Sequence, residues 1–217
     1  MRIDRWLWQL SGLLLIFLNS CSDTLESSVT VYSNDFSELD LSGFEGARLF
    51  IFQNDTISGF YNKEEVTLRL ENLPSHNVMK VTVDILVHDS WDGNPDDGQS
   101  GPDYWIMGID QHEVFRTTFS NSPCESTFCL YQSYPDNFAR QNVPKSGAVK
   151  TNIPGLCIFG AFSSYTTQYS ISKLVSHTNG DIDISLRDEL RQDGIPDQAC
   201  DESWSIASIV VEALVVN

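Results

Sequence analysis

The acidic stretch at residues 88–105, HDSWDGNPDDGQSGPDYW, holds the residue types of this chain that most readily suggest chemistry. It contains five aspartates, three glycines and two prolines, and it has no lysine or arginine. Two carboxylates about 4 Å apart repel each other by about 4 kcal/mol at an effective dielectric constant near 20. The stretch must therefore either open its carboxylates into solvent, where salt screens them, or be neutralised by a cation.

Calcium is the cation that this composition favours, because it takes six to eight oxygen ligands from flexible loops. Several residues fall at ligand positions of an EF-hand loop, but Asp97 stands where that loop needs glycine and Pro95 interrupts it, so we do not expect an EF-hand. We expect a structural calcium ion in the loop all the same. A second acidic segment at 193–202, DGIPDQACDE, could share the ion. The candidate ligands are Asp89, Asp92, Asn94, Asp96 and Asp103.

Aromatic residues beside the acidic stretch suggest a surface on which the apolar face of a sugar could stack. The candidates are Trp91, Tyr104 and Trp105. Tryptophan is also a common core residue, so Trp91 could equally be a plug beneath the loop. Trp204, at the start of an apolar strand, is expected to be structural.

The first 28 residues indicate export and lipid anchoring. Arg2 and Arg5 precede the short apolar run SGLLLIFL, which has the size and flanks of a signal-peptide core. The run ends in LNSC, which resembles a bacterial lipobox, and this resemblance implies cleavage before Cys21 and lipid attachment to it; an ordinary secretory signal is the alternative. We expect a signal peptide at 1–20, a polar tether at 21–28 and one domain at 29–217. The expected location is the bacterial cell envelope, at the outer membrane or cell surface.

The charge balance limits the partners. The formal net charge is −17, and it becomes −18 when residues 1–20 are removed. So large an acidic excess argues against nucleic acid and anionic membrane surfaces, and favours cations or neutral ligands such as sugars.

Four cysteines remain beyond Cys21, and an even number in an exported chain favours disulfides. Cys124 and Cys129 bracket the short loop CESTFC. We therefore favour the pairs Cys124–Cys129 and Cys157–Cys200. A metal site built on these cysteines is disfavoured, since the sequence has no CxxC and no histidine close to them.

The rest of the chain shows the patterns of strands and turns. Alternating or continuous apolar runs predict strands at 29–36, 66–73, 78–89, 168–177, 181–190 and from 204 to the C-terminus, with two more in 103–120. Asn179-Gly180 predicts a hairpin between 168–177 and 181–190. RDELRQD at 187–193 could be one helical turn, and 121–167 is expected to form long loops. Many short strands indicate an all-β, two-sheet antiparallel sandwich, jelly-roll-like in form.

Several short segments, taken together, resemble a module of bacterial secreted and surface proteins. They are NDF at 34–36, LPSH at 73–76, DSWDG at 89–93, GPD at 101–103, TTFSN at 117–121, QSYPD at 132–136 and DESW at 201–204. The resemblance covers roughly residues 30–217 and implies an extracellular jelly-roll-like sandwich similar to carbohydrate-binding modules. In many such sandwiches an acidic residue on the last strand contributes to a structural calcium site. Ala207 stands at the matching position, which puts the usual form of that site in doubt.

Enzymatic motifs are missing from the sequence: it has no GxSxG, HExxH, P-loop or GxGxxG. His88 and Asp89 are neighbours, but neighbours in a strand point to opposite faces. We therefore expect a lipid-anchored, calcium-stabilised module that binds a glycan or cell-surface polymer. The alternatives are a structural or adhesion module with protein partners and, less favoured, a carbohydrate-active enzyme with a carboxylate pair.

Overall fold

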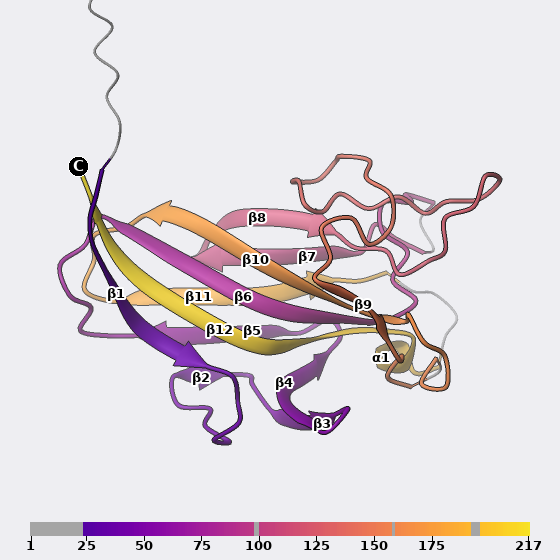
Figure 1. Cartoon of the computed structure of the whole chain (residues 1–217), viewed down its shortest axis with the longest axis horizontal. Helices are drawn as coiled ribbons and strands as arrows, with labels where there is room; N and C mark the ends of the chain where they lie inside the picture. Colours follow the sequence, from indigo (N-terminus) through magenta and orange to yellow (C-terminus); the bar gives the residue numbers. More distant parts are fainter. Residues whose placement is uncertain (1–23, 98–99, 158, 192–195) are drawn as a thin grey trace, which may run out of the picture.

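Two antiparallel sheets packed face to face form the domain, as the computed structural model of the chain shows (Figure 1). The structure describes residues 24–97, 100–157, 159–191 and 196–217. Sheet A contains β3 (Leu49–Phe52), β4 (Asp55–Tyr61), β12 (Glu202–Val216), β6 (Val78–Asp89), β10 (Thr166–Ser176) and β9 (Lys150–Ile153), and β1 (Leu25–Asn34) also pairs with β12. Sheet B contains β2 (Phe44–Glu45), β5 (Glu65–Leu70), β11 (Ile182–Glu189), β7 (Tyr104–Ile109) and β8 (His112–Thr118). The predicted all-β sandwich is confirmed.

The core lies between the inner faces of the two sheets. Along β6, the odd-numbered residues from Met79 to Val87 are completely buried, while Lys80, Thr82 and Asp84 between them are only partly buried. This alternation follows from the two-residue repeat of a strand. It breaks near the end of β6, where Leu86 and His88 on the outer face are buried as well. Something must therefore cover the outer face of sheet A at this end.

The predicted hairpin between 168–177 and 181–190 is wrong. β10 lies in sheet A between β6 and β9, whereas β11 lies in sheet B between β5 and β7. The segment with Asn179-Gly180 thus crosses from one sheet to the other. The expected helical turn at 187–193 is also wrong for its first three residues, which belong to β11; residues 192–195 lie outside the described part. The helix found among the described residues is the short α1 (Gln198–Asp201).

The sandwich has two different ends. The long loops 90–103, 119–149 and 154–165 gather at one end together with α1 (Figure 1). At the other end Thr24 and Asn217 exchange backbone hydrogen bonds of 2.9 and 3.0 Å, so the described chain starts and finishes side by side. No helix in the described residues is both long enough and apolar enough to cross a membrane.

Two disulfides pin the loop end. Cys124 pairs with Cys129 and Cys157 pairs with Cys200, which confirms the favoured pairing. The second bond ties the loop after β9 to α1, across 43 positions of sequence. The loop after β9 and α1 are therefore held together although β10 and β11 separate them in the sequence.

The end that holds Thr24 and Asn217 is closed by a pair of histidines. His76 Nε2 lies 2.7 Å from His177 Nδ1, and His76 Nδ1 lies 2.6 Å from the Pro74 carbonyl oxygen. His177 Nε2 lies 3.1 Å from Asp110 Oδ2 at the β7–β8 turn, close enough for an ion pair though not aligned as a hydrogen bond. These contacts link sheet A to sheet B by polar groups that are mostly buried.

Candidate functional site

Asp89, the last residue of β6, is completely buried, and its carboxylate accepts hydrogen bonds from the loop after β9. Its Oδ1 accepts a 2.9 Å hydrogen bond from the Leu156 amide, and its Oδ2 accepts a 3.2 Å bond from the Cys157 amide. A side chain at Gly155 would come within 2.4 Å of Oδ1, so this residue must be glycine for the loop to approach. Burial nevertheless raises the pKa of Asp89 to about 6.

Asp103 ties the two ends of the acidic loop together. Its Oδ2 accepts hydrogen bonds from the amides of Asp92, at 2.9 Å, and Gly93, at 3.3 Å, and its Oδ1 accepts one from the Arg191 amide at 3.3 Å. Gly93 has φ +84°, and a Cβ there would lie 2.4 Å from the Tyr131 carbonyl oxygen. The DSWDG and GPD segments therefore pack closely around the buried carboxylate of Asp103.

Glu202, at the start of β12, completes the acidic cluster. Its side chain is hydrogen-bonded to Asp103. Burial, together with the charges of Asp103, Asp92 and Asp201, raises the pKa of Glu202 far above its ordinary value. Burial likewise raises the pKa of Asp103, and burial followed by the charges of Asp201 and Asp97 raises that of Asp92 to about 6. Asp103 and Glu202 can thus share a proton, which removes repulsion without any ion.

The five residues predicted to bind calcium do not gather around one position where an ion could bind. The Asn94 side-chain oxygen accepts hydrogen bonds from Thr118 and Ser133, and its amide donates to the Arg140 carbonyl. Asp96 lies exposed. Within the described part of the chain, no three Asp, Glu, His or Cys side chains meet in an arrangement that could hold a metal ion. Calcium binding stays a prediction, and Asp92, Asp103 and Asp201 lie near enough to Glu202 for their charges to raise its pKa.

The predicted sugar platform at Trp91 and Trp105 is wrong, because both side chains are completely buried. Trp91 Nε1 donates a 2.9 Å hydrogen bond to the Ser203 carbonyl, so Trp91 plugs the space beneath the loop. Trp105 packs perpendicular to Trp204, with 6.0 Å between ring centroids. Tyr104 is only partly buried, and its ring already packs against Phe138 and the Arg116 guanidinium. As expected, Trp204 is a core residue, with Nε1 donating to Asp188 at 2.7 Å.

Residues of the other recurring segments are also engaged in the fold. Asn121, from TTFSN, donates through Nδ2 to the carbonyls of Val87, Asp89 and Tyr165. Gln132, from QSYPD, is buried and accepts hydrogen bonds at Oε1 from the amides of Ser120 and Lys145. Buried polar groups need such partners. The DSWDG, GPD, TTFSN, QSYPD and DESW segments therefore specify how the loop end folds, and a ligand-binding surface must be sought elsewhere.

A groove of about 330 Å³ lies on the outer face of sheet A, near the loop end. The side chains that cover the buried end of β6 also form its floor. Its floor is apolar and comes from five strands: Phe52, Ile57, Leu86, Ile153 and Ala207. Its rim is polar and includes Asp35, Ser37, Gln53, Asp55, Lys150 and Gln168. Such a combination of an apolar floor and a few polar groups is typical of small-molecule sites of about 300 Å³ and more.

The floor of the groove rests on a rigid support. Phe52 packs edge-on over His88, with 4.9 Å between ring centroids. His88 is completely buried, and its two ring nitrogens lie 3.0 Å from Thr166 Oγ1 and 2.9 Å from Ser205 Oγ. Burial lowers the pKa of His88 to about 3, so the ring is neutral at physiological pH. The contact between Ser205 and His88 lies beneath the floor, and the other ring nitrogen of His88 faces the Thr166 hydroxyl and not a carboxylate. The role of this contact is therefore structural.

Other hollows are larger but differ in character. One of about 820 Å³ lies between β1 and the β2–β5 edge of sheet B. Two of about 490 and 390 Å³ lie over sheet B. Arg69 and Arg187, which line these two, are already in ion pairs with Asp183 and Glu189. The 820 Å³ hollow is also partly apolar, with Val31, Phe44 and Leu70, but it lies at the edges of the sheets. The groove on sheet A differs in that apolar side chains of five strands of one sheet form its floor.

Comparison with known proteins adds little to this geometry. No protein-family model matches the sequence, and no curated protein matches it. Among solved structures, the chain is similar to a family GH115 4-O-methyl-alpha-glucuronidase with specificity for decorated arabinogalactans, at a TM-score of 0.41 and 9% identity. This match covers 84% of the chain but only 17% of that enzyme.

A second similar structure is a family 35 carbohydrate binding module from Clostridium thermocellum, at a TM-score of 0.35 and 10% identity. This match covers 88% of the chain and 97% of that module. Both TM-scores lie below 0.5. We therefore assign neither a ligand nor an activity from these likenesses.

Proposed function

We propose that the protein is an extracytoplasmic, lipid-anchored binding module, and that the groove on the outer face of sheet A takes a segment of a glycan. The observation that carries this proposal is the groove itself, with its apolar floor and polar rim on a rigid sheet. The proposed anchor, Cys21, lies outside the described residues. The described chain begins at the end of the sandwich opposite the loops, so a tether there would leave the groove accessible.

The chemistry of the groove suits a sugar ring. A pyranose has C–H groups on its faces and hydroxyl groups around its edge. Phe52, Leu86 and Ile153 are each 7% exposed, and the parts that line the groove are apolar, so they can contact a face. Gln168 and Asp55 on the rim offer hydrogen-bond donors and acceptors for hydroxyls. Lys150 adds one positive charge to a rim that also holds two aspartates. A neutral glycan therefore fits better than a strongly charged one.

The test uses a pair of variants on the same face of β10. Gln168 points to the groove, and Ser170, the next outward residue of the strand, lies exposed beyond it. We expect the Lys150→Ala/Gln168→Ala variant to lose at least about tenfold in affinity, equivalent to about 1.4 kcal/mol, and Ser170→Ala to bind like the wild type. Affinity electrophoresis through gels containing xyloglucan, mixed-linkage β-glucan, galactomannan or arabinogalactan would measure this.

Two results would contradict the proposal. One is a wild-type protein that no neutral polysaccharide retards. The other is an equal loss of retardation in the groove variant and in Ser170→Ala, which would mean that the groove plays no specific part. Circular dichroism of all three proteins should show the same fold, because the three substituted side chains lie on the outer face of the sheet.

A further inference from the structure

A patch of three aromatic rings lies in the loop 154–165, directly after β9. Phe159 and Tyr165 stack face to face, with 4.1 Å between ring centroids and 5° between ring planes. Phe162 packs edge-on against both, at 6.3 Å from each. Phe162 is 58% exposed. Large exposed aromatic groups gathered in one place commonly mark a binding surface.

The patch is held firmly in place. Asp89 accepts hydrogen bonds from the amides of Leu156 and Cys157, and its own amide donates to the Tyr165 carbonyl at 2.6 Å. The Cys157–Cys200 disulfide adds a covalent link. Within the loop, the Phe162 carbonyl accepts from the Gly155 amide. A surface ordered in this way loses little conformational entropy when a ligand binds.

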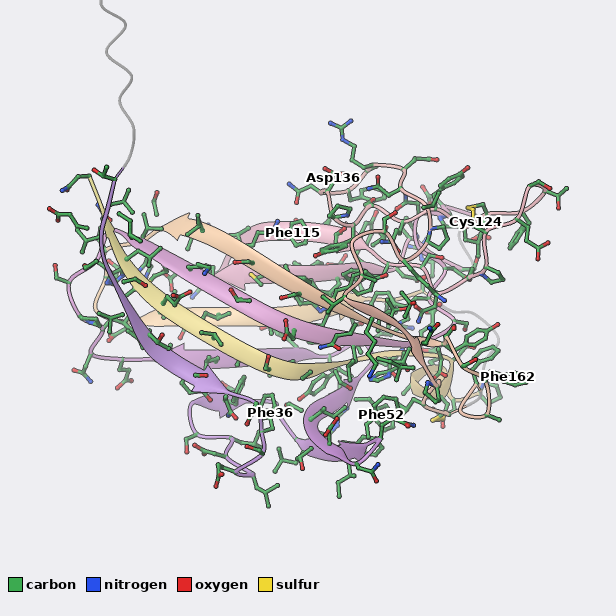
Figure 2. The ribbon with its side chains drawn as sticks, in the orientation of Figure 1. Phe36, Phe52, Phe115, Cys124, Asp136 and Phe162 are labelled. Carbon is green, nitrogen blue, oxygen red and sulfur yellow. A yellow bond between two sulfur atoms is a disulfide. The ribbon has the colours of Figure 1, made fainter. Side chains whose placement is uncertain are left out.

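The loop that carries the patch starts beside the groove. Lys150 and Ile153 of β9 line the groove, and the loop with the patch starts at the next residue. Leu156, within the loop, packs against the apolar cluster that forms the groove floor. Figure 2 shows Phe52 and Phe162 toward the lower right of the molecule, Phe162 nearer the loop end. The patch therefore lies on the loop that leaves the groove at the end of β9, toward the loop end of the sandwich.

We infer that the groove and the aromatic patch are two successive subsites for a linear polysaccharide chain of pyranose units, with Phe162 stacking on a unit beyond the one in the groove. The inference rests on the proposed function and deepens it, since it selects an internal chain segment rather than a single terminal sugar. Aromatic rings suit this role because their faces are large and rigid, and because they carry only two rotatable side-chain bonds.

The experiment compares Phe162→Ala with Phe128→Ala. Phe128 is a matched control, since it is 61% exposed and lies in the separate Cys124–Cys129 loop. The ligands are the disaccharide and the hexasaccharide of whichever test polysaccharide the wild type retains, titrated by calorimetry. We expect Phe162→Ala to weaken hexasaccharide binding about tenfold or more and to leave disaccharide binding within about twofold. Phe162→Trp should keep hexasaccharide affinity, and Phe128→Ala should behave like the wild type with both.

The outcomes separate this inference from the proposed function. Equal hexasaccharide affinities of Phe162→Ala and the wild type would overturn the second subsite while leaving the groove intact. An equal loss in Phe128→Ala would also overturn it, because the effect would then not belong to the patch. A wild type that binds the disaccharide as tightly as the hexasaccharide would show that one subsite suffices. A wild type that binds no polysaccharide would overturn both proposals.

Discussion

At the scale of single residues, the main finding is how the acidic loop tolerates its own charge. Asp89 and Asp103 turn inward and accept backbone amide hydrogen bonds, and Asp103 is also hydrogen-bonded to Glu202. A shared proton therefore offers an alternative to the calcium ion that the sequence suggested. The acids are protonated when they share a proton and ionised when they bind calcium. The stability of the two states therefore changes with pH in opposite directions.

The first prediction concerns this pH response in chelator. Acids whose pKa is raised on folding stabilise the protein fully below their unfolded pKa, near 4, and this stabilisation is lost as pH rises through the folded pKa. For Asp89 and Asp92 the folded pKa is about 6. We therefore expect the melting temperature in EDTA to fall between pH 5 and pH 8. Glu202→Gln should flatten the slope, and Glu38→Gln, on the exposed surface, should not.

The second prediction compares the melting temperature with calcium and with EDTA. If the ion binds the acidic cluster, calcium at about 100 times its dissociation constant should stabilise the protein by about 2.7 kcal/mol, mostly near pH 8, where the acids ionise. Asp92→Asn should remove this gain. Identical melting curves at pH 8 with calcium and with EDTA would count against a bound ion. A melting temperature that rises with pH in EDTA would count against the shared proton.

At the scale of elements, the loop end depends on covalent links because it contains little regular structure. The Cys157–Cys200 bond joins positions 43 apart, whereas Cys124 and Cys129 are 5 apart. In the chain-entropy view, a disulfide restricts the unfolded chain more when it closes a longer loop. The two bonds should therefore contribute unequally to stability.

A pair of double variants measures this difference. We expect Cys157→Ser/Cys200→Ser to lower the free energy of unfolding by roughly 4 kcal/mol and Cys124→Ser/Cys129→Ser by roughly 2 kcal/mol, as measured by urea denaturation. The first variant should also loosen the aromatic patch and raise amide hydrogen exchange around Leu156. A larger loss from the short-range bond would refute the explanation by loop length.

Sequence patterns predicted the long strands well and the groove not at all. β6 was predicted at 78–89, the bounds that the structure gives, because its apolar run is long and bordered by turn residues. β2, β3 and β9 have two to four residues, too few to show periodicity. Asn179-Gly180 indicated a turn but could not reveal that the next strand joins the other sheet. The floor of the groove combines side chains from five strands, so the groove can be predicted only when the order of these strands in the sheet is known.

The acidic loop shows a different kind of failure. Its composition drew attention to a cluster of acids, but a sequence cannot show which way a carboxylate points. The partners that decide this, such as the amides of Leu156 and Arg191, lie 67 and 88 positions away from the acids that they bind. The burial of Trp91 follows from the same folding of the loop over the core.

At the scale of the whole molecule, the fold places its first described residues and its loops at opposite ends (Figure 1). If Cys21 carries the proposed lipid, the binding face stands away from the membrane. We expect Cys21→Ser to move the protein from the membrane fraction to the soluble extracytoplasmic fraction, while Ser22→Ala stays in the membrane. Fractionation followed by detergent phase separation would show this. Persistent membrane association of Cys21→Ser would contradict the anchor.

The pairing of β1 with β12 has a mechanical consequence. β1 runs from Leu25 to Asn34 beside Val216 to Ile209, so the strand nearest the proposed tether lies along the last strand of the chain. Antiparallel hydrogen bonds are perpendicular to their strands. A pull on residue 24, resisted by a polymer held at the loop end, would act in shear and strain many of these bonds at once. The joint between tether and domain should therefore withstand drag from flow better than a strand that peels away bond by bond.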